Sequence, residues 1–176
     1  MREIEVKAWL RDRSSVIERL EEMGCIFGPG KSQKDVAFFP SNYEDGADST
    51  GVNFLRLRRQ DGKTILTLKR PVSGLDKYER ETVVENEDAM RDIILSLGFR
   101  ERSTVEKRRN TTTYAGMEIC IDDVTDLGSF IEVERMVEEG DGEKIQGEMF
   151  HFLKELGVEE RDRVTRGYDL LIMDKQ

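Results

Sequence analysis

The sequence predicts an α+β fold in which antiparallel strands close into a barrel and helices pack against its outer side. Three observations support this prediction: several short segments alternate charged and apolar residues, two tight turns join such segments, and three helices each carry one apolar face. Successive side chains of a strand point to opposite faces, so each alternating segment has one charged and one apolar face. The helices are available to cover the apolar faces, which leaves the charged faces inside the barrel.

Length and composition limit the class of protein. We expect a single domain over residues 1–176, because a chain of this length buries an adequate core without disulfides. The net charge of -9 argues against a nucleic-acid partner. No apolar run approaches the roughly 18 residues that cross a bilayer, and the charged N-terminus has no signal-peptide core. We therefore expect no membrane partner and a cytoplasmic location.

The cysteine and histidine content restricts the metals that the chain could hold. Cys25, Cys120 and His151 are too few for a Cys/His zinc cage or a disulfide framework. A bound metal would therefore be held by carboxylates, which favours Mg²⁺ or Mn²⁺ over zinc.

The opening strand shows the alternation most clearly. Glu3, Glu5 and Lys7 share one face, while Ile4 and Val6 share the other. A lone strand of this kind would place its charged face in water. Two later segments repeat the pattern, however, and each of the three is followed by a helix that ends at a glycine, which indicates a repeated architecture. The repeats begin at Glu3, Glu79 and Glu132, and the predicted helices cover residues 12–24, 86–98 and 141–156.

Two turns set the register of the predicted hairpins. Asp61-Gly62 is a strong two-residue turn signal between alternating runs, and Ala115-Gly116 is a weaker signal for a second turn. Each turn aligns residues of the two strands that it joins, so that charged residues meet on one face. The predicted pairs are Phe54 with Lys69, Arg56 with Thr67, Arg109 with Asp122, and Thr111 with Cys120.

Three connecting segments are less regular. The segment from Pro40 to Gly51 is rich in Asn, Asp, Ser and Gly, which favours a loop. Residues 71–77 are expected to form a second loop, and the tail from Val164 to Met173 is compatible with either a strand or a short helix.

The charged faces bring both signs of charge into the predicted lumen. Burying so many ions only to stabilise a fold is implausible, because the desolvation of each ion costs several kcal/mol. A ligand-binding lumen explains them better. The cations would bind a polyanion, and a divalent cation between the carboxylates and the polyanion would remove their repulsion. The pattern therefore indicates a polyphosphate bound with Mg²⁺ or Mn²⁺. The cations are Lys7, Arg56, Arg58, Lys69, Lys107 and Arg109, and the acids are Glu3, Glu5, Glu79, Glu81, Asp122, Glu132 and Glu134.

Six motifs, in order along nearly the whole chain, resemble the CYTH or triphosphate tunnel metalloenzyme family. That family includes class IV adenylate cyclases, thiamine triphosphatases and inorganic tripolyphosphatases. The motifs are Glu3-x-Glu5-x-Lys7, Leu55-Arg56-Leu57-Arg58, Leu68-Lys69-Arg70-Pro71, Glu79-x-Glu81, Lys107-x-Arg109, and Asp122 followed by Leu127-Gly128-x-Phe130-x-Glu132-x-Glu134.

The resemblance implies an eight-stranded antiparallel barrel that forms a triphosphate tunnel. It implies that Glu3, Glu5, Glu132 and Glu134 bind the metal, that Glu79 and Glu81 tune or complete that site, and that Asp122 and Lys7 act in catalysis. It also implies that the triphosphate is bound by Lys7, Arg56, Arg58, Lys69, Lys107 and Arg109. The chain departs from the family in its tail, where Arg166 to Leu171 is one residue short of the usual ending, and Cys120 faces the predicted lumen.

The resemblance leaves three functions open. The first expectation is a class IV adenylate cyclase-like reaction from ATP to cyclic AMP and pyrophosphate, and the alternative is a tripolyphosphatase or a thiamine or nucleoside triphosphatase that releases orthophosphate. The third is a non-catalytic polyphosphate or nucleotide binder, against which the intact set of carboxylates argues. The expected partner is a small-molecule triphosphate (ATP, thiamine triphosphate or tripolyphosphate), and the expected assembly is a monomer or a homodimer.

Overall fold

The structure, a computed structural model, describes residues 2–44 and 47–175. The strands are β1 (Arg2–Trp9), β2 (Lys31–Pro40), β3 (Phe54–Gln60), β4 (Lys63–Ser73), β5 (Asp76–Val84), β6 (Phe99–Tyr114), β7 (Met117–Val124), β8 (Gly128–Val137) and β9 (Arg163–Val164). The helices are α1 (Arg13–Glu22), α2 (Glu87–Ser96), α3 (Gly142–Glu155) and α4 (Tyr168–Met173), with a short 3₁₀ turn at Glu160–Asp162.

The strands form one antiparallel sheet with the order β5-β4-β3-β2-β6-β7-β8-β1-β9 and an additional pairing between β5 and β1. The pairing of β5 with β1 closes the eight long strands into a barrel. The two-residue strand β9 pairs with β1 as well. The predicted fold class, α+β with an eight-stranded antiparallel barrel, is therefore confirmed.

The chain forms two compact units, which we describe separately. Unit 1 comprises Met1–Lys31 and Arg108–Thr165, and unit 2 comprises Ser32–Lys107 and Arg166–Gln176. The expectation of one domain over the whole chain stays a prediction. Within the part of the chain that the structure describes, no helix is both long and apolar enough to cross a membrane.

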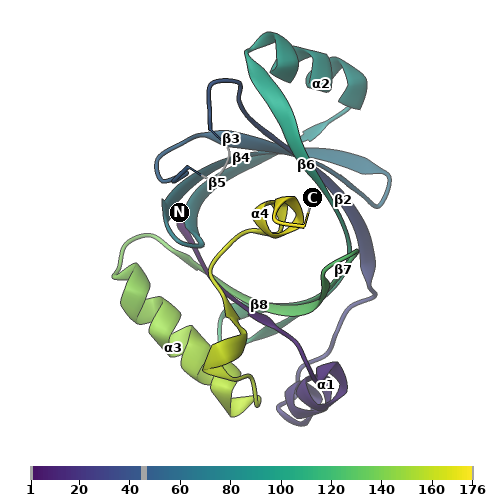
Figure 1. The fold of residues 1–176 in the computed structure, drawn as a ribbon. Helices are drawn as coiled ribbons and strands as arrows, with labels where there is room; N and C mark the ends of the chain where they lie inside the picture. Colours follow the sequence, from purple (N-terminus) through teal and green to yellow (C-terminus); the bar gives the residue numbers. More distant parts are fainter. Residues whose placement is uncertain (1, 45–46, 176) are drawn as a thin grey trace. The chain divides into compact units, whose positions relative to one another are not determined.

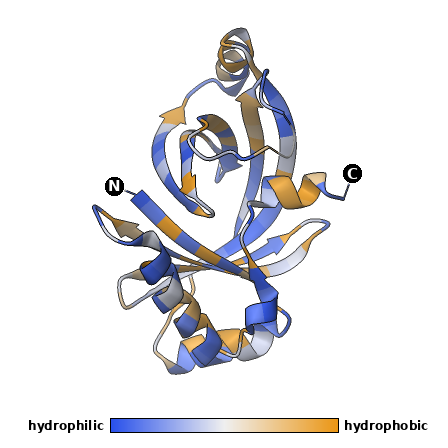
Figure 2. Cartoon of the chain, turned by 60° about the vertical axis from the view of Figure 1, so that its left-hand side comes forward, coloured by the Kyte–Doolittle hydropathy of each residue, from blue (hydrophilic) through white to orange (hydrophobic). Residues whose placement is uncertain are grey.

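Unit 1 contains the larger apolar core. Helices α1 and α3 lie on one side of β1, β7 and β8 (Figure 1), and their Leu20, Met149 and Leu153 side chains pack against the apolar faces of these strands. The alternation that produces these faces is visible as blue and orange bands along β1, beside the N label in Figure 2. The buried strand residues include Ile4, Val6, Ile119, Ile121, Ile131 and Val133.

The helix starts and stops of unit 1 follow from local chemistry. Asp12 caps α1 by accepting a hydrogen bond from the Ser15 backbone N–H at 3.0 Å, and Asp141 caps α3 in the same way. Gly157 follows the end of α3 with a φ of 89°, a left-handed conformation that glycine adopts without strain. Two of the three predicted helices are thereby confirmed.

Unit 2 confirms the first predicted hairpin. Arg56 pairs with Thr67 and Phe54 with Lys69, as the turn at 61–62 requires. Both turn residues have a positive φ, 51° at Asp61 and 73° at Gly62. A type I′ turn requires this, and its twist matches that of the two strands it joins.

The cover over the apolar face of unit 2 is thinner than predicted. Helix α2 forms as expected with Asn86 as its cap, but of its predicted apolar stripe only Ile94 is buried. Ile94 packs against Phe38 and Leu57, whereas Leu97 remains 68% exposed. Helix α2 therefore covers the sheet through Ile94, while Ile93 and Leu97 of its apolar stripe stay exposed.

Two predicted connections differ in the structure. The loop expected over residues 71–77 is wrong, because β4 continues to Ser73 and β5 begins at Asp76. The register shifts between Pro71 and Ser73, so the missing N–H of Pro71 interrupts the ladder only locally. The tail forms both elements that were considered, the strand β9 and the helix α4, whose apolar residues appear orange near the C label in Figure 2.

Candidate functional site

Three predicted metal ligands of unit 1 lie together. Glu3 and Glu5 extend from β1 and Glu134 from β8, and one carboxylate oxygen of each lies within 4.8 Å of the other two. The alternation of β1 places Glu3 and Glu5 on the same face, and the register of β1 and β8 sets Glu5 opposite Glu134. Three carboxylate oxygens at this spacing fit a hard divalent cation such as Mg²⁺ or Mn²⁺ after small side-chain movements.

The electrostatics of this group also favour a cation. Burial, followed by the charges of Glu3, Glu132 and Glu5, raises the pKa of Glu134 to about 8, although Arg109 opposes the rise. Burial is the largest cause of this rise, and the negative charges of the three neighbouring carboxylates add to it. A divalent cation beside Glu134 would offset both effects, so the donor set fits the metal that the sequence predicts.

The two predicted phosphate ligands of unit 1, Lys7 and Arg109, are held by carboxylates. Lys7, which is 3% exposed, places its Nζ 3.2 Å from Glu5 Oε1 and 3.0 Å from Glu132 Oε1. Arg109 donates to both oxygens of Asp122, at 2.7 and 2.6 Å, and contacts Glu132 as well. Burial alone would lower the pKa of Arg109, but the charges of Glu132 and Asp122 raise it well above its usual value. Asp122 is fully buried, and its contacts position the Arg109 guanidinium.

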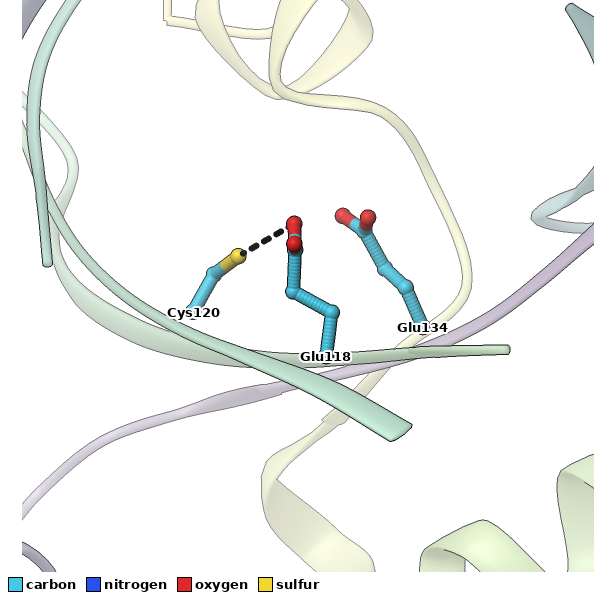
Figure 3. A group of neighbouring side chains, drawn as sticks. All are labelled: Glu118, Cys120 and Glu134. Carbon is cyan, nitrogen blue, oxygen red and sulfur yellow. Dashed lines mark hydrogen bonds between the residues drawn. The ribbon is translucent and has the colours of Figure 1, made fainter. Parts of the chain in front are cut away.

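Unit 1 also contains a second group that the sequence analysis only partly identified. Glu118, Cys120 and Glu134 offer ligand atoms within 4.8 Å of one another, and Figure 3 shows their side chains on the same side of β7 and β8. The Cys120 Sγ lies 3.7 Å from Glu118 Oε1 and 3.8 Å from Thr111 Oγ1, as the predicted pairing of Thr111 with Cys120 requires. Glu118 was absent from the predicted site, although the register of the hairpin at 115–116 places it on the charged face.

The Cys120 thiol is not poised as a nucleophile. Burial raises its pKa, and the nearby charges of Glu134, Glu132 and Asp122 raise it further, so the thiol stays protonated.

Among the predicted phosphate ligands of unit 2, Arg56 contacts several neighbouring side chains. Its Nη2 donates to Thr67 Oγ1 at 3.0 Å and to Glu81 Oε2 at 3.1 Å. Its Nε–H is buried and has no hydrogen-bond partner among the described residues. A buried donor of this kind is suited to an additional acceptor, and a phosphate oxygen is one.

Arg58 has a partner that the sequence analysis missed. Its Nε and Nη2 donate to the two oxygens of Asp35, both at 2.7 Å. Burial would raise the pKa of Asp35, but the hydrogen bonds from Arg58 and the charges of Arg56, Arg58 and Lys107 lower it far below its usual range. Extending the alternation from β3 to β2 would have found Asp35, because it lies directly opposite Arg58 in the sheet.

Lys69 lies beside the two predicted metal ligands of unit 2. Its Nζ is 2.5 Å from Glu79 Oε1, and Arg56 and Lys77 each lie 3.8 Å from the same carboxylate. Burial would raise the pKa of Glu79, but the charges of Lys69, Arg56 and Lys77 lower it to about 2. Glu79 is thus surrounded by cations and Glu81 contacts Arg56, and the role of both glutamates in binding metal stays a prediction.

The helix α4 packs against the remaining predicted phosphate ligand. The Lys107 Nζ lies 4.8 Å from the centre of the Tyr168 ring, and the Arg102 Nε donates to the Met173 sulfur at 2.9 Å. Lys107 is 7% exposed. The tail of the chain therefore contacts the same face of the sheet as the predicted phosphate ligands of unit 2.

Comparisons with known proteins identify the family. The sequence profile of the CYTH domain matches residues 1–168. The chain belongs to the CYTH domain family. It is 31% identical, over 174 residues, to a protein named "Putative adenylate cyclase MJ0240" from Methanocaldococcus jannaschii, and the alignment covers 96% of this chain and 97% of that protein.

Solved structures of other proteins share the fold. The PH1819 protein from Pyrococcus horikoshii OT3 superposes with a TM-score of 0.81 and 27% identity, with 99% of each chain covered. HpAC1 from Hippeastrum, described as a putative adenylyl cyclase with a dominant triphosphatase activity, superposes with a TM-score of 0.58 and 18% identity over 94% of this chain and 90% of that one. The family is metal-dependent in general, and the Methanocaldococcus relative is named a putative adenylate cyclase.

Proposed function

We propose that this CYTH protein is a metal-dependent enzyme that acts on a small-molecule triphosphate. The observation that carries the proposal is the carboxylate group of Glu3, Glu5 and Glu134, whose ligand atoms lie within 4.8 Å of one another. Phosphate binding alone does not need carboxylates, since they repel the ligand. Carboxylates that face the same side as cations are explained when a divalent cation lies between them and the phosphates.

The residues of unit 1 have separate roles in this proposal. Glu3, Glu5 and Glu134 would hold Mg²⁺ or Mn²⁺, with Glu132 beside them, and Glu79 and Glu81 of unit 2 stay predicted ligands. When bound, the metal supplies charge neutralisation at the phosphate oxygens and lowers the pKa of the attacking hydroxyl or water. Lys7 holds Glu5 and Glu132 in place, and Asp122 positions Arg109 for a phosphate oxygen.

The cations of unit 2 bind the triphosphate in this proposal. Arg56 offers its buried Nε–H, and Arg58 presents a guanidinium whose orientation is fixed by Asp35. Lys69 and Lys107 contribute point charges. Guanidinium groups suit the planar arrangement of phosphate oxygens, and together these cations stabilise the charge that develops on a departing or transferred phosphate.

The first candidate reaction is that of a class IV adenylate cyclase, in which the ribose 3′-hydroxyl of ATP attacks the α-phosphorus and pyrophosphate leaves. The name of the Methanocaldococcus relative supports this choice. The second candidate is hydrolysis of the terminal phosphate, which the Hippeastrum protein supports as an activity of the same fold. A cytoplasmic location, which the sequence predicts, agrees with either reaction.

The test incubates the purified protein with ATP, thiamine triphosphate or tripolyphosphate, each with Mg²⁺ or Mn²⁺, and identifies the products by chromatography. Cyclic AMP with pyrophosphate is the expected result for the cyclase, and orthophosphate is the expected result for the hydrolase. Binding of a triphosphate without turnover of any of the three would contradict the proposal and favour a non-catalytic binder.

A further inference from the structure

We propose that unit 2 carries a docking surface for a second copy of this chain, formed by one side of α2 and by the face of β4 and β5 opposite the candidate site. We call this surface the apolar patch, and its most exposed members are Leu68, Tyr78, Ile93 and Leu97. All four residues belong to unit 2, and none is part of the candidate site. Association through this surface is therefore independent of the proposed function.

The strand part of the patch faces away from the candidate site. Leu68 on β4 follows Thr67, which accepts a hydrogen bond from Arg56, so the alternation of the strand points Leu68 to the opposite face. Leu68 pairs with Arg80 on β5, and Tyr78 lies two residues before Arg80 on the same face. Leu68 is 36% exposed and Tyr78 is 47% exposed. This face of β4 and β5 therefore presents large apolar side chains to solvent.

The helix part of the patch faces the same strands. Ile94 is the residue of α2 that is buried in the core of unit 2. With about 3.6 residues per turn, Ile93 and Leu97 lie on one flank of Ile94, and Arg91 lies on the other. Arg91 contacts Glu101 of β6, and the sheet order places β6 and β4 on opposite sides of β2 and β3. Ile93 and Leu97 therefore lie on the flank nearer to β4.

The two parts are continuous. Leu55 and Leu66 are partly buried and pack against the core cluster that contains Ile94. Leu55 pairs directly with Leu68, and Leu66 lies two residues before Leu68 on the same face. In unit 1, two helices pack against the apolar strand faces, whereas in unit 2 the single helix α2 covers only part of this face. Contiguous exposed apolar side chains of this kind mark an interaction surface.

Opposite charges at the two ends of the patch favour a second copy as its occupant. The exposed residues of the basic end are Arg70 and Arg80, and those of the acidic end are Glu85, Asp88 and Asp92. Glu87, at the start of α2, accepts a hydrogen bond from Thr64 Oγ1, and Thr64 lies six residues before Arg70 on β4. The two ends are therefore about 20 Å apart along the strand.

A surface with this distribution of charge is complementary to itself. A two-fold axis through the patch sets the basic end of one copy against the acidic end of the other, while the apolar side chains meet in the centre. Tyr78 belongs to a residue type that is enriched in interfaces. Because the patch is small, we expect a reversible dimer with a dissociation constant on the order of 10 μM and a monomer that folds without its partner.

Sedimentation velocity at protein concentrations on both sides of this value measures the association. Leu97→Gln replaces an exposed apolar side chain of the patch, and Ile26→Gln, which replaces an exposed apolar residue of unit 1, is the matched control. We expect Leu97→Gln to raise the dissociation constant at least about tenfold, because each residue occurs twice in a two-fold interface. Ile26→Gln should leave the constant within about twofold of the wild type.

Two charge-reversed variants test the two-fold arrangement. The double variant Arg70→Glu, Arg80→Glu reverses the basic end, and Glu85→Lys, Asp92→Lys reverses most of the acidic end. Each variant alone brings like charges together in the dimer, so each should stay monomeric. An equimolar mixture restores opposite charges at both ends and should form a mixed dimer. Association in the mixture would also show that both variants are folded.

Three results would each overturn the proposal: a wild type that is monomeric at every concentration, a dimer that Leu97→Gln leaves unchanged, and a mixture of the charge-reversed variants that does not associate. A monomeric wild type would leave the apolar patch to a partner other than a second copy. Association beyond the dimer would contradict the two-fold packing, because a two-fold interface closes after two copies.

Discussion

Two glutamates of similar burial, one in each unit, have pKa values shifted in opposite directions. The side chain of Glu134 in unit 1 is 17% exposed and that of Glu79 in unit 2 is 11% exposed. Burial favours the protonated form of both. The pKa of Glu134 nevertheless rises to about 8, whereas that of Glu79 falls to about 2. The neighbours therefore decide the direction: carboxylates surround Glu134, and Lys69, Arg56 and Lys77 surround Glu79.

The two charged faces therefore differ in which sign of charge is in excess. In unit 1, acids outnumber cations around Glu134, so this face is suited to an additional cation. In unit 2, the two predicted metal ligands Glu79 and Glu81 are already balanced by cations, and Arg56 retains a buried N–H donor for an anion. Unit 1 is therefore suited to a cation, and unit 2 is suited to an anion.

The largest effect is expected from Glu5→Gln in unit 1. The substitution keeps the shape of the side chain but removes one charge from the carboxylate group, so we expect turnover with Mg²⁺ to fall about 10³-fold. Initial rates with the substrate found in the product assay measure this loss, and electron paramagnetic resonance of added Mn²⁺ measures metal affinity independently.

Glu139→Gln is the matched control, since Glu139 is an exposed glutamate of the same unit, outside the candidate site. It should retain wild-type rates and Mn²⁺ affinity. Wild-type turnover by Glu5→Gln would show that the carboxylates of unit 1 do not hold the metal used in the reaction.

The second-largest effect is a loss of stability when the helix packing of unit 1 is disturbed. Leu153 on α3 is fully buried against unit 1, whereas Leu97 at the end of α2 is 68% exposed. Leu153→Ala should lower the free energy of unfolding by about 3 kcal/mol, because it leaves a cavity, and Leu97→Ala should lower it by less than about 0.5 kcal/mol. Urea denaturation followed by circular dichroism measures both, and equal losses would contradict the difference in packing.

The sequence predicted the strands, the hairpin register and the charged faces, because alternation and two-residue turns are local signals. It also predicted the pair of Arg109 with Asp122, because the turn at 115–116 is a local signal, but it did not predict the pair of Arg58 with Asp35. Asp35 lies on β2, whose pairing with β3 is not set by a two-residue turn. The exposed side of α2 could not be predicted either, since an apolar stripe does not specify how much of it meets the sheet.

The smallest effect is a pH dependence that separates the two units. Glutamate has an ordinary pKa of 4.5, and the folded-state pKa of Glu134 is raised to about 8. The folded protein therefore binds this proton more tightly than the unfolded chain does. The stability from Glu134 is complete below about pH 4.5 and is lost as the pH rises towards 8.

In the presence of EDTA, we expect the free energy of unfolding to fall between pH 5.5 and 7.5 by at most about 1.4 kcal/mol per pH unit from this group. Glu134→Gln removes the titrating group and should flatten the slope, and so should saturating Mg²⁺, which favours the ionised carboxylate. Glu79→Gln should leave the slope in this range unchanged, because Glu79 titrates near pH 2 when folded and its stability is lost only as the pH falls below about 4.5. Equal slopes in the wild type and in Glu134→Gln would show that the carboxylates of unit 1 are not in excess, and the contrast between the two faces would not hold.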